Sequence, residues 1–493
     1  MLILSILPLI IFVLFVFFGK LKILWASLIS LFSTLVLVVF VWQMKFSFIE
    51  ASFLKGTFLA ADILLIIFGA LFFLETLRKT RIIEGLCLYL EKISPDYRVQ
   101  VILLAWFLES FLEGTAGFGA PSAIVAPLLI GIGLSPITAV SVALLGNSAS
   151  VVFGAAGTPI RVGFSGINIV NVPLYTALIN MVGFLVPVFM LWMITSKQIE
   201  KRKHFLEALP FAIFSGIAFV VPSVFFVFLG QEFPSIIGSI VGFLLVFLAI
   251  KLKIFIPKQV RVLRKEQLVV EKMNILKALT PYILLIILLI IGKIFFNNMG
   301  YTVDFGYRHT FSFFNPGIAF ILATIPTIFL FRKNVKFEIR TVGESLKKAI
   351  EPFLVIAVIS IMVQLMVNSS QNLSGYFSLL QIIADNFKTG LLPFISPIIG
   401  AFGSFLTGSA TVSNIMFGNI LENTSKAIGF NPAIILSLEL VGAAAGNMIA
   451  LADILPTLTV VNLKGEEREV IKRVFIPCAI YVLLAGIVGL LIA

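Results

Sequence analysis

The chain has 493 residues, of which 60% are hydrophobic and only 12% are charged. A soluble domain contains about a quarter charged residues, whereas most segments here are apolar runs of about 17–25 residues, the length that spans a bilayer as a helix. Composition therefore excludes a secreted enzyme, a nucleic-acid-binding protein and a disordered chain, and the formal charge of +12 is explained by basic cytoplasmic loops.

Ten apolar segments are predicted to cross the membrane as single helices. They cover residues 2–18, 22–42, 57–75, 174–195, 208–230, 234–250, 280–296, 314–331, 350–368 and 474–492. Two longer apolar regions, 100–169 and 391–461, are interrupted by Gly, Pro, Ser and Asn. We therefore expect an all-α polytopic membrane protein with about 12 transmembrane helices, in which the two long regions contain broken helices.

Basic loops indicate the orientation of these segments. The loops at 251–277 and 332–348 are rich in Lys and Arg, so both are predicted to be cytoplasmic. Propagating this assignment along the chain puts the N-terminus outside. All the basic loops fall on the cytoplasmic side only if segments 100–134 and 391–428 each enter and leave the membrane on one side. The first then enters from inside and the second from outside. Both are therefore predicted to be re-entrant helical hairpins.

The two interrupted regions also resemble each other in sequence. SFLEGTA begins at Ser110 and SFLTGSA begins at Ser404, an offset of 294 residues. Residues 133–136 (GLSP) match 429–432 (GFNP), and residues 141–146 match 437–442, both at an offset of 296. Because the charge-derived topology inserts the copies in opposite directions, the sequence predicts inverted-topology repeats, an architecture common among secondary transporters.

The predicted organisation has three parts. The first inverted repeat covers 1–198, with its hairpin at about 100–134 and a broken crossing helix at about 137–169. Residues 199–274 supply linker helices and a basic cytoplasmic loop. The second inverted repeat covers 275–493, with its hairpin at about 391–428 and a broken helix at about 431–461.

The hairpin tips predict where a ligand binds. Unwound backbone is tolerated at membrane depth only where it is buried in protein or lines a wet cavity. The tips at 114–122 and 408–414 contain small and polar residues, which let the backbone approach a ligand. Half-helices that restart after each tip direct N–H groups and the positive dipole end at the cavity, which suits an anion.

Three charged residues in these regions are candidates for transport chemistry, because an ionised group at the membrane centre costs at least about 2.5–3.5 kcal/mol. Glu113 is the candidate proton-coupling carboxylate, since an acid removed from water binds a proton more readily. Its alternative role is to cap the N–H groups of the next half-helix. Asp453, in the second break, is a candidate salt-bridge partner of Arg161, a proton shuttle or a sodium ligand.

Arg161 follows the first break, and its guanidinium could hold a substrate carboxylate through two parallel hydrogen bonds. The alternative is a structural ion pair with Asp453, Glu439 or Glu109. Neutral donors and small residues at the tips and the crossing helix complete the predicted substrate site: Asn147, Ser148, Gly114, Thr115, Gly408, Ser409, Thr411 and Asn414. The same polar residues could instead satisfy backbone groups freed by the breaks.

These motifs resemble those of the L-lactate permease family. Residues 94–96 (SPD) and 111–121 (FLEGTAGFGAP) are similar to its first-hairpin signature, and residues 147–148 with 153–159 (FGAAGTP) to its next motif. Residues 405–409 (FLTGS) with Ser413 and Asn414 resemble its second hairpin. The resemblance extends weakly over nearly the whole chain.

The resemblance implies a function. It points to a symporter of L-lactate and related 2-hydroxymonocarboxylates such as glycolate, driven by protons across the cell (cytoplasmic) membrane. It also implies an elevator-type alternating-access mechanism and, because such transporters are often dimers, a homodimer. No cofactor, metal or nucleic acid is expected, and the protein is not expected to be an enzyme.

The chain departs from the family's pattern at two positions that bear on coupling. Ala410 stands where the family has an acid, and Asn447 stands where it has a lysine. Proton and sodium coupling therefore both remain open at this point. The alternative function is the same scaffold carrying another organic or inorganic anion with Na⁺, and a more remote alternative is a membrane-embedded enzyme that acts on lipid-linked substrates.

Overall fold

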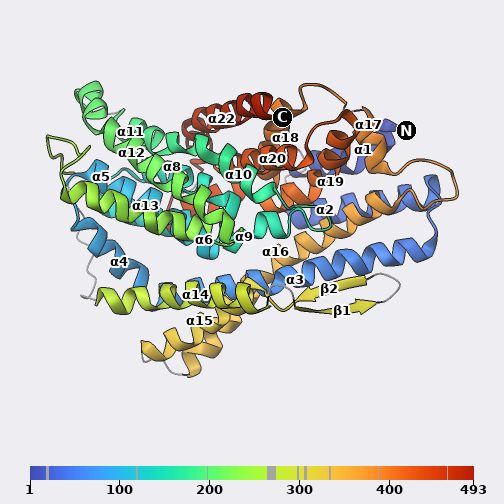
Figure 1. The fold of residues 1–493 in the computed structure, drawn as a ribbon, viewed down its shortest axis with the longest axis horizontal. Helices are drawn as coiled ribbons and strands as arrows, with labels where there is room; N and C mark the ends of the chain where they lie inside the picture. The colour runs from blue at the N-terminus through green and yellow to red at the C-terminus, as the bar shows by residue number, and fades with distance from the viewer. Residues whose placement is uncertain are drawn as a thin grey trace.

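The computed structural model describes residues 1–17, 21–117, 120–196, 198–263, 274–296, 299–304, 308–331, 335–386, 388–463 and 465–493. Nearly all regular structure in these residues is helical (Figure 1). Eleven of the described helices are long and apolar enough to cross a bilayer, against about 12 predicted. The all-α polytopic fold class is therefore confirmed.

The first part of the chain leads to the linker helices. Its elements are α1 (Leu2–Phe17), α2 (Ile23–Val36), η1 (Leu37–Val41), α3 (Phe46–Lys79), α4 (Ile82–Glu91), α5 (Tyr97–Ile102), η2 (Leu103–Leu108), α6 (Glu109–Ala116), α7 (Ala120–Ile132), α8 (Pro136–Asn147), η3 (Ser148–Phe153), α9 (Gly154–Arg161), α10 (Val172–Ile179), η4 (Asn180–Leu185) and α11 (Val186–Thr195).

The linker helices and the second part follow. Their elements are α12 (Lys201–Phe226), η5 (Val227–Leu229), α13 (Pro234–Lys251), α14 (Ile275–Phe296), β1 (Gly300–Asp304), β2 (Arg308–Ser312), α15 (Pro316–Leu330), α16 (Val335–Asn368), α17 (Leu379–Asn386), α18 (Leu392–Thr407), α19 (Ala410–Ile428), α20 (Pro432–Asn447), α21 (Leu451–Val460) and α22 (Glu467–Ile492).

Two features differ from the sequence-based expectation. α3 and α16 each have 34 residues and extend well before the predicted apolar segments at 57–75 and 350–368, because helix formation continues through polar residues where apolar length ends. The antiparallel pair β1–β2, with Thr302 opposite Thr310, was not predicted. It lies between α14 and α15, where the sequence shows no apolar run.

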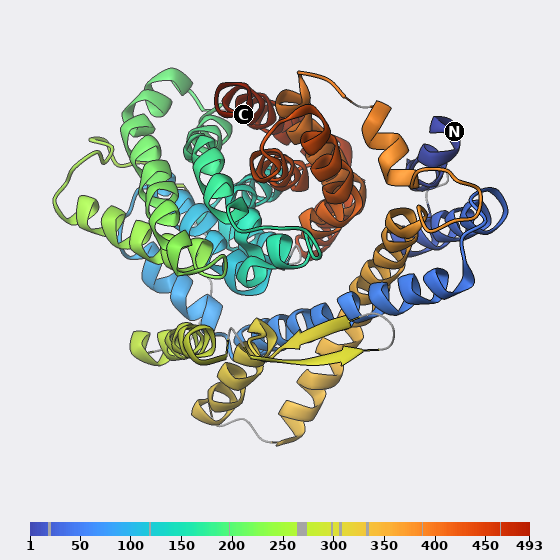
Figure 2. The ribbon, with the colours of Figure 1, turned by 45° about the vertical axis from the view of Figure 1, so that its right-hand side comes forward.

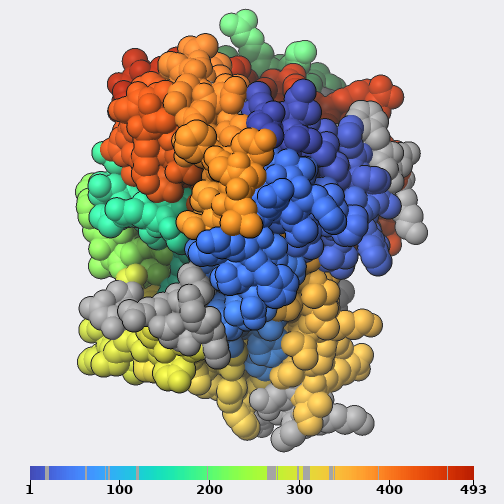
Figure 3. Space-filling model, turned by 90° about the vertical axis from the view of Figure 1, so that its right-hand side faces the viewer, coloured from blue at the N-terminus to red at the C-terminus, as the bar shows by residue number. Residues whose placement is uncertain are grey.

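The helices form a bundle and an arm. In Figure 2, α5–α13 and α18–α22 make up the bundle, and α3 and α16 run side by side along one flank of it. We call α2, α3, α14, α15 and α16 the arm. Figure 3 shows the face on which the N-terminal helices lie beside the segment of α16 and α17, in agreement with the packing of α1 on α17 and α2 on α16.

Two clusters of buried apolar side chains hold these parts together. The larger cluster joins the bundle to α4, α14, α15 and the end of α3. The smaller cluster joins α1–α3, α16 and α17 to the second hairpin through residues such as Leu406 and Ile415. The second hairpin therefore packs on the arm as well as on the rest of the bundle.

Both predicted hairpin regions contain helices too short to cross a bilayer. α7 has 13 residues, a length of about 20 Å at 1.5 Å per residue, against about 30 Å for the hydrocarbon core. α18 has 16 residues and is likewise short. Part of the first tip, residues 118–119, lies outside the described residues.

The matched GLSP and GFNP segments adopt the same turn. α7 ends at Ile132 and α19 ends at Ile428, and the next residues, Gly133 and Gly429, have positive φ angles of 111° and 82°. A glycine in this conformation closes a helix C-terminus, and proline is favoured at the first position of the next helix. Pro136 and Pro432 then begin the crossing helices α8 and α20.

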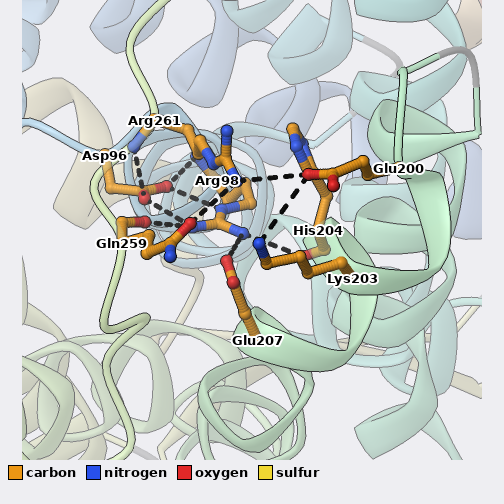
Figure 4. A network of polar contacts seen from close by, with 8 residues as sticks. All are labelled: Asp96, Arg98, Glu200, Lys203, His204, Glu207, Gln259 and Arg261. Atoms are coloured by element: carbon orange, nitrogen blue, oxygen red, sulfur yellow. Dashed lines mark hydrogen bonds and ion pairs between the residues drawn. The ribbon is translucent and has the colours of Figure 1, made fainter.

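A buried ionic network fixes the base of the first hairpin (Figure 4). Asp96 caps α5: its Oδ1 accepts from Arg98 N at 2.9 Å, and its Oδ2 accepts from Arg98 Nη2 at 2.8 Å. The fully buried Arg98 also donates to the carbonyl oxygens of His204 and Gln259, both at 2.8 Å. The start of the hairpin is thereby tied to α12 and to the segment after α13.

Candidate functional site

Two predicted acids and one predicted amide meet between the first hairpin and the two breaks. Glu113, on α6, accepts a hydrogen bond from the Asn147 side chain at the end of α8, and it interacts electrostatically with Asp453 of α21. All three side chains are buried. One oxygen of each, Glu113 Oε2, Asn147 Oδ1 and Asp453 Oδ2, has no hydrogen-bond partner among the described residues. The cluster is therefore rich in acceptors.

The first break presses directly against this cluster. Ala155, Ala156 and Gly157 have φ angles of 41°, 53° and 78°, so α9 contains three successive left-handed residues. For alanine this conformation is strained, and such residues concentrate at functional sites. A side chain at Gly154 would collide with Glu113 Oε1. The glycine therefore lets the broken helix approach the carboxylate.

The second hairpin meets the second break in a similar way. α18 ends at Thr407, and a side chain at the next residue, Gly408, would collide with Ala452 at the start of α21. Ser409 then caps α19, since its Oγ accepts from Val412 N at 3.3 Å. One turn later, Asn414 Nδ2 donates to Pro159 O of α9 at 2.8 Å. This bond links the second hairpin to the first break.

Arg161 has different partners from those predicted. Its Nη1 lies 3.5 Å from Glu232 Oε1, its Nη2 donates to Phe314 O, and its guanidinium carbon lies 5.1 Å from the centre of the Phe314 ring. Among the described residues it forms no ion pair with Asp453, Glu439 or Glu109. The predicted pairing with these acids is wrong because Glu232, in the turn between α12 and α13, reaches the guanidinium instead.

A small cavity opens beside Arg161. Its volume is about 170 Å³, and it lies between the bundle and the arm. The lining residues are Leu59, Ile66, Arg161, Val162, Ser165, Ser312, Phe314 and Asn315. Two hydroxyls, an amide and a guanidinium therefore surround one apolar-walled space.

Other predicted site residues lie away from the acid cluster or are already satisfied. Gly114 packs against α13, where an added Cβ would lie 2.9 Å from Ile236 N. Thr115 Oγ1 donates to Phe111 O at 3.0 Å, and Ser148 Oγ donates to Leu145 O at 2.6 Å, each within its own helix. Thr411 is buried in the first turn of α19.

The sequence reasoning missed Glu232 and Lys293. Lys293 Nζ lies 3.3 Å from both oxygens of Glu232 and 5.3 Å from the centre of the Phe314 ring. Glu232 thus bridges the bundle residue Arg161 and the arm residue Lys293. The available signal was that both charged residues lie at the edges of apolar segments predicted to end on the same side of the membrane.

The described residues contain no group of three or more His, Cys, Asp or Glu side chains arranged to hold a metal ion. What the site offers is a set of buried carboxylates and amides and, separately, a guanidinium beside a cavity. The first suits a proton or a small cation, and the second suits a carboxylate.

Comparison with known proteins places this architecture in a family. A model of the L-lactate permease family matches residues 1–313 and 293–493, and so covers the whole chain. The putative L-lactate permease of Haemophilus influenzae is 28% identical over 466 residues, which cover 86% of this chain and 85% of that protein. The glycolate permease GlcA of Escherichia coli K12 is 27% identical over 456 residues, which cover 81% and 79%.

Among solved structures, the Alcanivorax borkumensis YdaH transporter aligns over 90% of this chain and 87% of that chain, with a TM-score of 0.49 and 13% identity. The matching family and the relatives are permeases, which are transporters rather than enzymes. With its many apolar helices, the chain is a multi-pass membrane protein and belongs to the L-lactate permease family.

Proposed function

We propose that the protein is a secondary active symporter, which moves L-lactate and related 2-hydroxymonocarboxylates such as glycolate across the cytoplasmic membrane together with protons. Relatives named for L-lactate and for glycolate support the substrate class. The observation that carries the coupling is the pair of Glu113 and Asp453, two buried carboxylates that interact with each other and have no ion-pair partner in the described part of the chain.

The chemistry of this pair favours a proton. Two carboxylates that face each other away from water cannot both be ionised at low cost, so the pair retains a proton. The unpaired oxygens Glu113 Oε2 and Asp453 Oδ2 are acceptors only, and a proton converts one of the acids into a donor. Asn147 holds the Glu113 carboxylate in place through the bond from its amide.

In the proposed site, Arg161 binds the carboxylate of the substrate. A substrate carboxylate needs donors, and the cavity beside Arg161 offers the guanidinium together with Ser165, Ser312 and Asn315. The 3.5 Å separation between Arg161 and Glu232 is long for an ion pair. An incoming carboxylate can therefore exchange with Glu232.

The mechanism, repeats and orientation belong to the same proposal. The chain consists of inverted repeats at 1–198 and 275–493, joined by 199–274. The bundle, which contains the hairpins, moves against the arm in an elevator-type cycle. The N-terminus lies outside. Support comes from the similar turns after α7 and α19 and from the contact of each hairpin with a helix break.

Reconstitution into proteoliposomes tests the function. Radiolabelled L-lactate uptake is measured with an inward proton gradient, an inward sodium gradient or neither, and unlabelled glycolate is added as a competitor. We expect accumulation with the proton gradient alone and competition by glycolate. Accumulation with the sodium gradient alone would instead assign Na⁺ to the acceptor cluster, and no uptake under any condition would overturn the proposed substrate class.

A further inference from the structure

Two buried acids outside the Glu113–Asp453 pair have matching environments. Glu109 and Glu439 are both fully buried. Ser122 Oγ donates to Glu109 Oε1 at 2.7 Å, and Ser413 Oγ donates to Glu439 Oε1 at 2.7 Å. In each acid the second oxygen, Oε2, is buried and has no hydrogen-bond partner among the described residues. The same carboxyl–hydroxyl pair therefore occurs in both halves of the chain.

The two serines lie at similar places in the hairpins, at an offset of 291 residues, which is three to five fewer than the offsets of the matched segments on either side. Ser122 lies in the first turn of α7, the second arm of the first hairpin, and Ser413 lies in the first turn of α19, the second arm of the second hairpin. Ser122 Oγ also lies 3.4 Å from Ala143 O of the crossing helix α8. Ser413 Oγ also donates to Gly400 O of the first arm α18 at 3.2 Å. Each serine thus sits between the first arm and the crossing helix.

The acids reach these serines from opposite elements. Glu109 lies on the first arm, and the offset of 294 relates it to Gly403, where a side chain would collide with Ser413 Oγ. Glu439 lies on the crossing helix, and the offset of 296 relates it to Ala143. A small residue therefore stands in each half where the other half has its acid. Both halves keep one carboxyl at the serine, although they supply it from different helices.

Packing alone does not require an acid at this place. A buried carboxylate without a cation is costly unless it takes up a proton, and neither acid has an ion-pair partner among the described residues. The charged group that faces Glu109 is Glu113, one turn further along the same helix. Through Glu113, Glu109 therefore interacts electrostatically with the proposed coupling pair Glu113–Asp453.

We propose that Glu109 and Glu439 are two further proton-binding sites, one in each half of the molecule, which load and release a proton during transport. On loading, the carboxylate takes the proton at Oε2 and becomes a neutral acid, while the serine hydroxyl keeps its bond to Oε1; release reverses this step. Glu109 exchanges its proton with Glu113. The inference rests on the proton coupling proposed above.

The number of protons taken up per lactate tests whether Glu109 and Glu439 bind protons during transport. Wild type, Glu109→Gln and Glu439→Gln are reconstituted with an entrapped pH-sensitive dye, and protons taken up per labelled lactate are measured beside lactate–lactate exchange, which needs no net proton movement. We expect both Gln variants to retain exchange and to lose part of the proton uptake per lactate. A ratio equal to that of wild type in both variants would overturn the proposal, because the acids would then be permanently neutral structural groups.

The exchanged positions supply a rescue variant. Glu109→Gly should lose the same part of the proton uptake per lactate, and Glu109→Gly with Ala143→Glu should regain it, because the carboxyl returns to Ser122 from the crossing helix as in the second half. Absence of this rescue in a folded double variant counts against equivalent sites.

Serine variants cover the case in which the Gln proteins do not fold. Ser122→Ala and Ser413→Ala keep both acids and remove the hydroxyl that stabilises the ionised form, so the pH profile of uptake should shift to higher pH. An unshifted profile in both overturns the proposal. A wild-type protein that takes up lactate without protons overturns the proposed proton coupling itself. Failure of the coupling can therefore be distinguished from failure of the Glu109 and Glu439 sites.

Discussion

Glu113 lies where three broken or capped segments meet, and this placement fits the coupling role that we propose for it. The hairpin presents it, the Asn147 amide orients it, and the unwound backbone at Gly154 approaches its Oε1. A side chain placed in this way can change its hydrogen bonds only if the break or the hairpin moves. Its protonation state is therefore linked to the conformation of both elements.

Glu113→Gln tests this link. The amide keeps the volume and can neither bind nor release the transported proton, so lactate accumulation driven by a pH gradient should be lost while lactate–lactate exchange persists. Wild-type accumulation should rise as the external pH falls, because loading requires the protonated acid, and the variant should lose this dependence. Glu422→Gln, which removes an acid paired with Lys426 at the end of α19, serves as the matched control. Accumulation retained by the Glu113 variant would contradict the assignment.

The partners of Arg161 show what could be predicted of single residues. The Glu113 motif and the break before Arg161 were identifiable from small and polar residues at membrane depth. The pairing with Glu232 was not, because the 70 residues between the two include three α-helices whose packing decides which acid reaches the guanidinium. The pattern of apolar residues along the sequence does not predict that packing.

The Glu232 bridge predicts that removing only its two cations destabilises the protein more than removing all three charges. The Glu232 side chain is 1% exposed, whereas those of Arg161 and Lys293 are 23% and 28% exposed. Arg161→Ala with Lys293→Ala leaves a buried carboxylate without its cations and should lower stability by about 3 kcal/mol. Adding Glu232→Gln to this double variant should restore most of the loss. Thermal unfolding in detergent measures both changes, and a triple variant no more stable than the double one would contradict the bridge.

At the scale of elements, the left-handed segment in α9 is the least ordinary part of the fold. Three successive residues with positive φ turn the chain sharply within a buried helix, and two of them are alanines, for which this conformation costs about 1–2 kcal/mol each. The strain is maintained by the packing of Gly117 on Ala155 and of Gly157 on the turn at Gln231.

The same substitution should therefore have opposite effects at two sites. Ala156→Gly removes strain and should leave the unfolding temperature unchanged or raised. Ala139→Gly, in the regular helix α8, should destabilise by about 1 kcal/mol. Unfolding of the two purified variants in the same detergent gives the comparison. A drop for Ala156→Gly as large as that for Ala139→Gly would show that the turn is not strained.

Element prediction succeeded where a local signal was strong. The apolar helices and the two breaks follow from apolar length interrupted by Gly and Pro, which act locally. The re-entrant course of the hairpins stays a prediction, and the sequence showed the glycine–proline segments only as a match between the halves. The strands β1 and β2 and the polar extensions of α3 and α16 were missed, because hydropathy reports where a helix leaves the apolar region and not where its hydrogen bonding ends.

At the scale of the whole molecule, apolar length was sufficient for the fold class, and the inverted relation between the halves stays a prediction from internal similarity and charge distribution. What these signals do not contain is the assembly of the bundle and the arm. The contact of α3 with α16 and the packing of the second hairpin on the arm depend on side-chain shape over long sequence separations.

The orientation of the assembled molecule is the remaining whole-molecule prediction, and it can be tested with single cysteines. In a background with Cys87→Ser and Cys478→Ala, Lys258→Cys should react with a membrane-impermeant maleimide only after the cells are permeabilised, because loops rich in Lys and Arg are generally retained inside. Val170→Cys, whose parent residue is 81% exposed, lies on the opposite side in this topology and should react in intact cells. Both parent side chains are exposed, so a difference in labelling reports sidedness rather than burial. Labelling of Lys258→Cys in intact cells, with protection of Val170→Cys, would invert the topology and with it the side from which each hairpin enters.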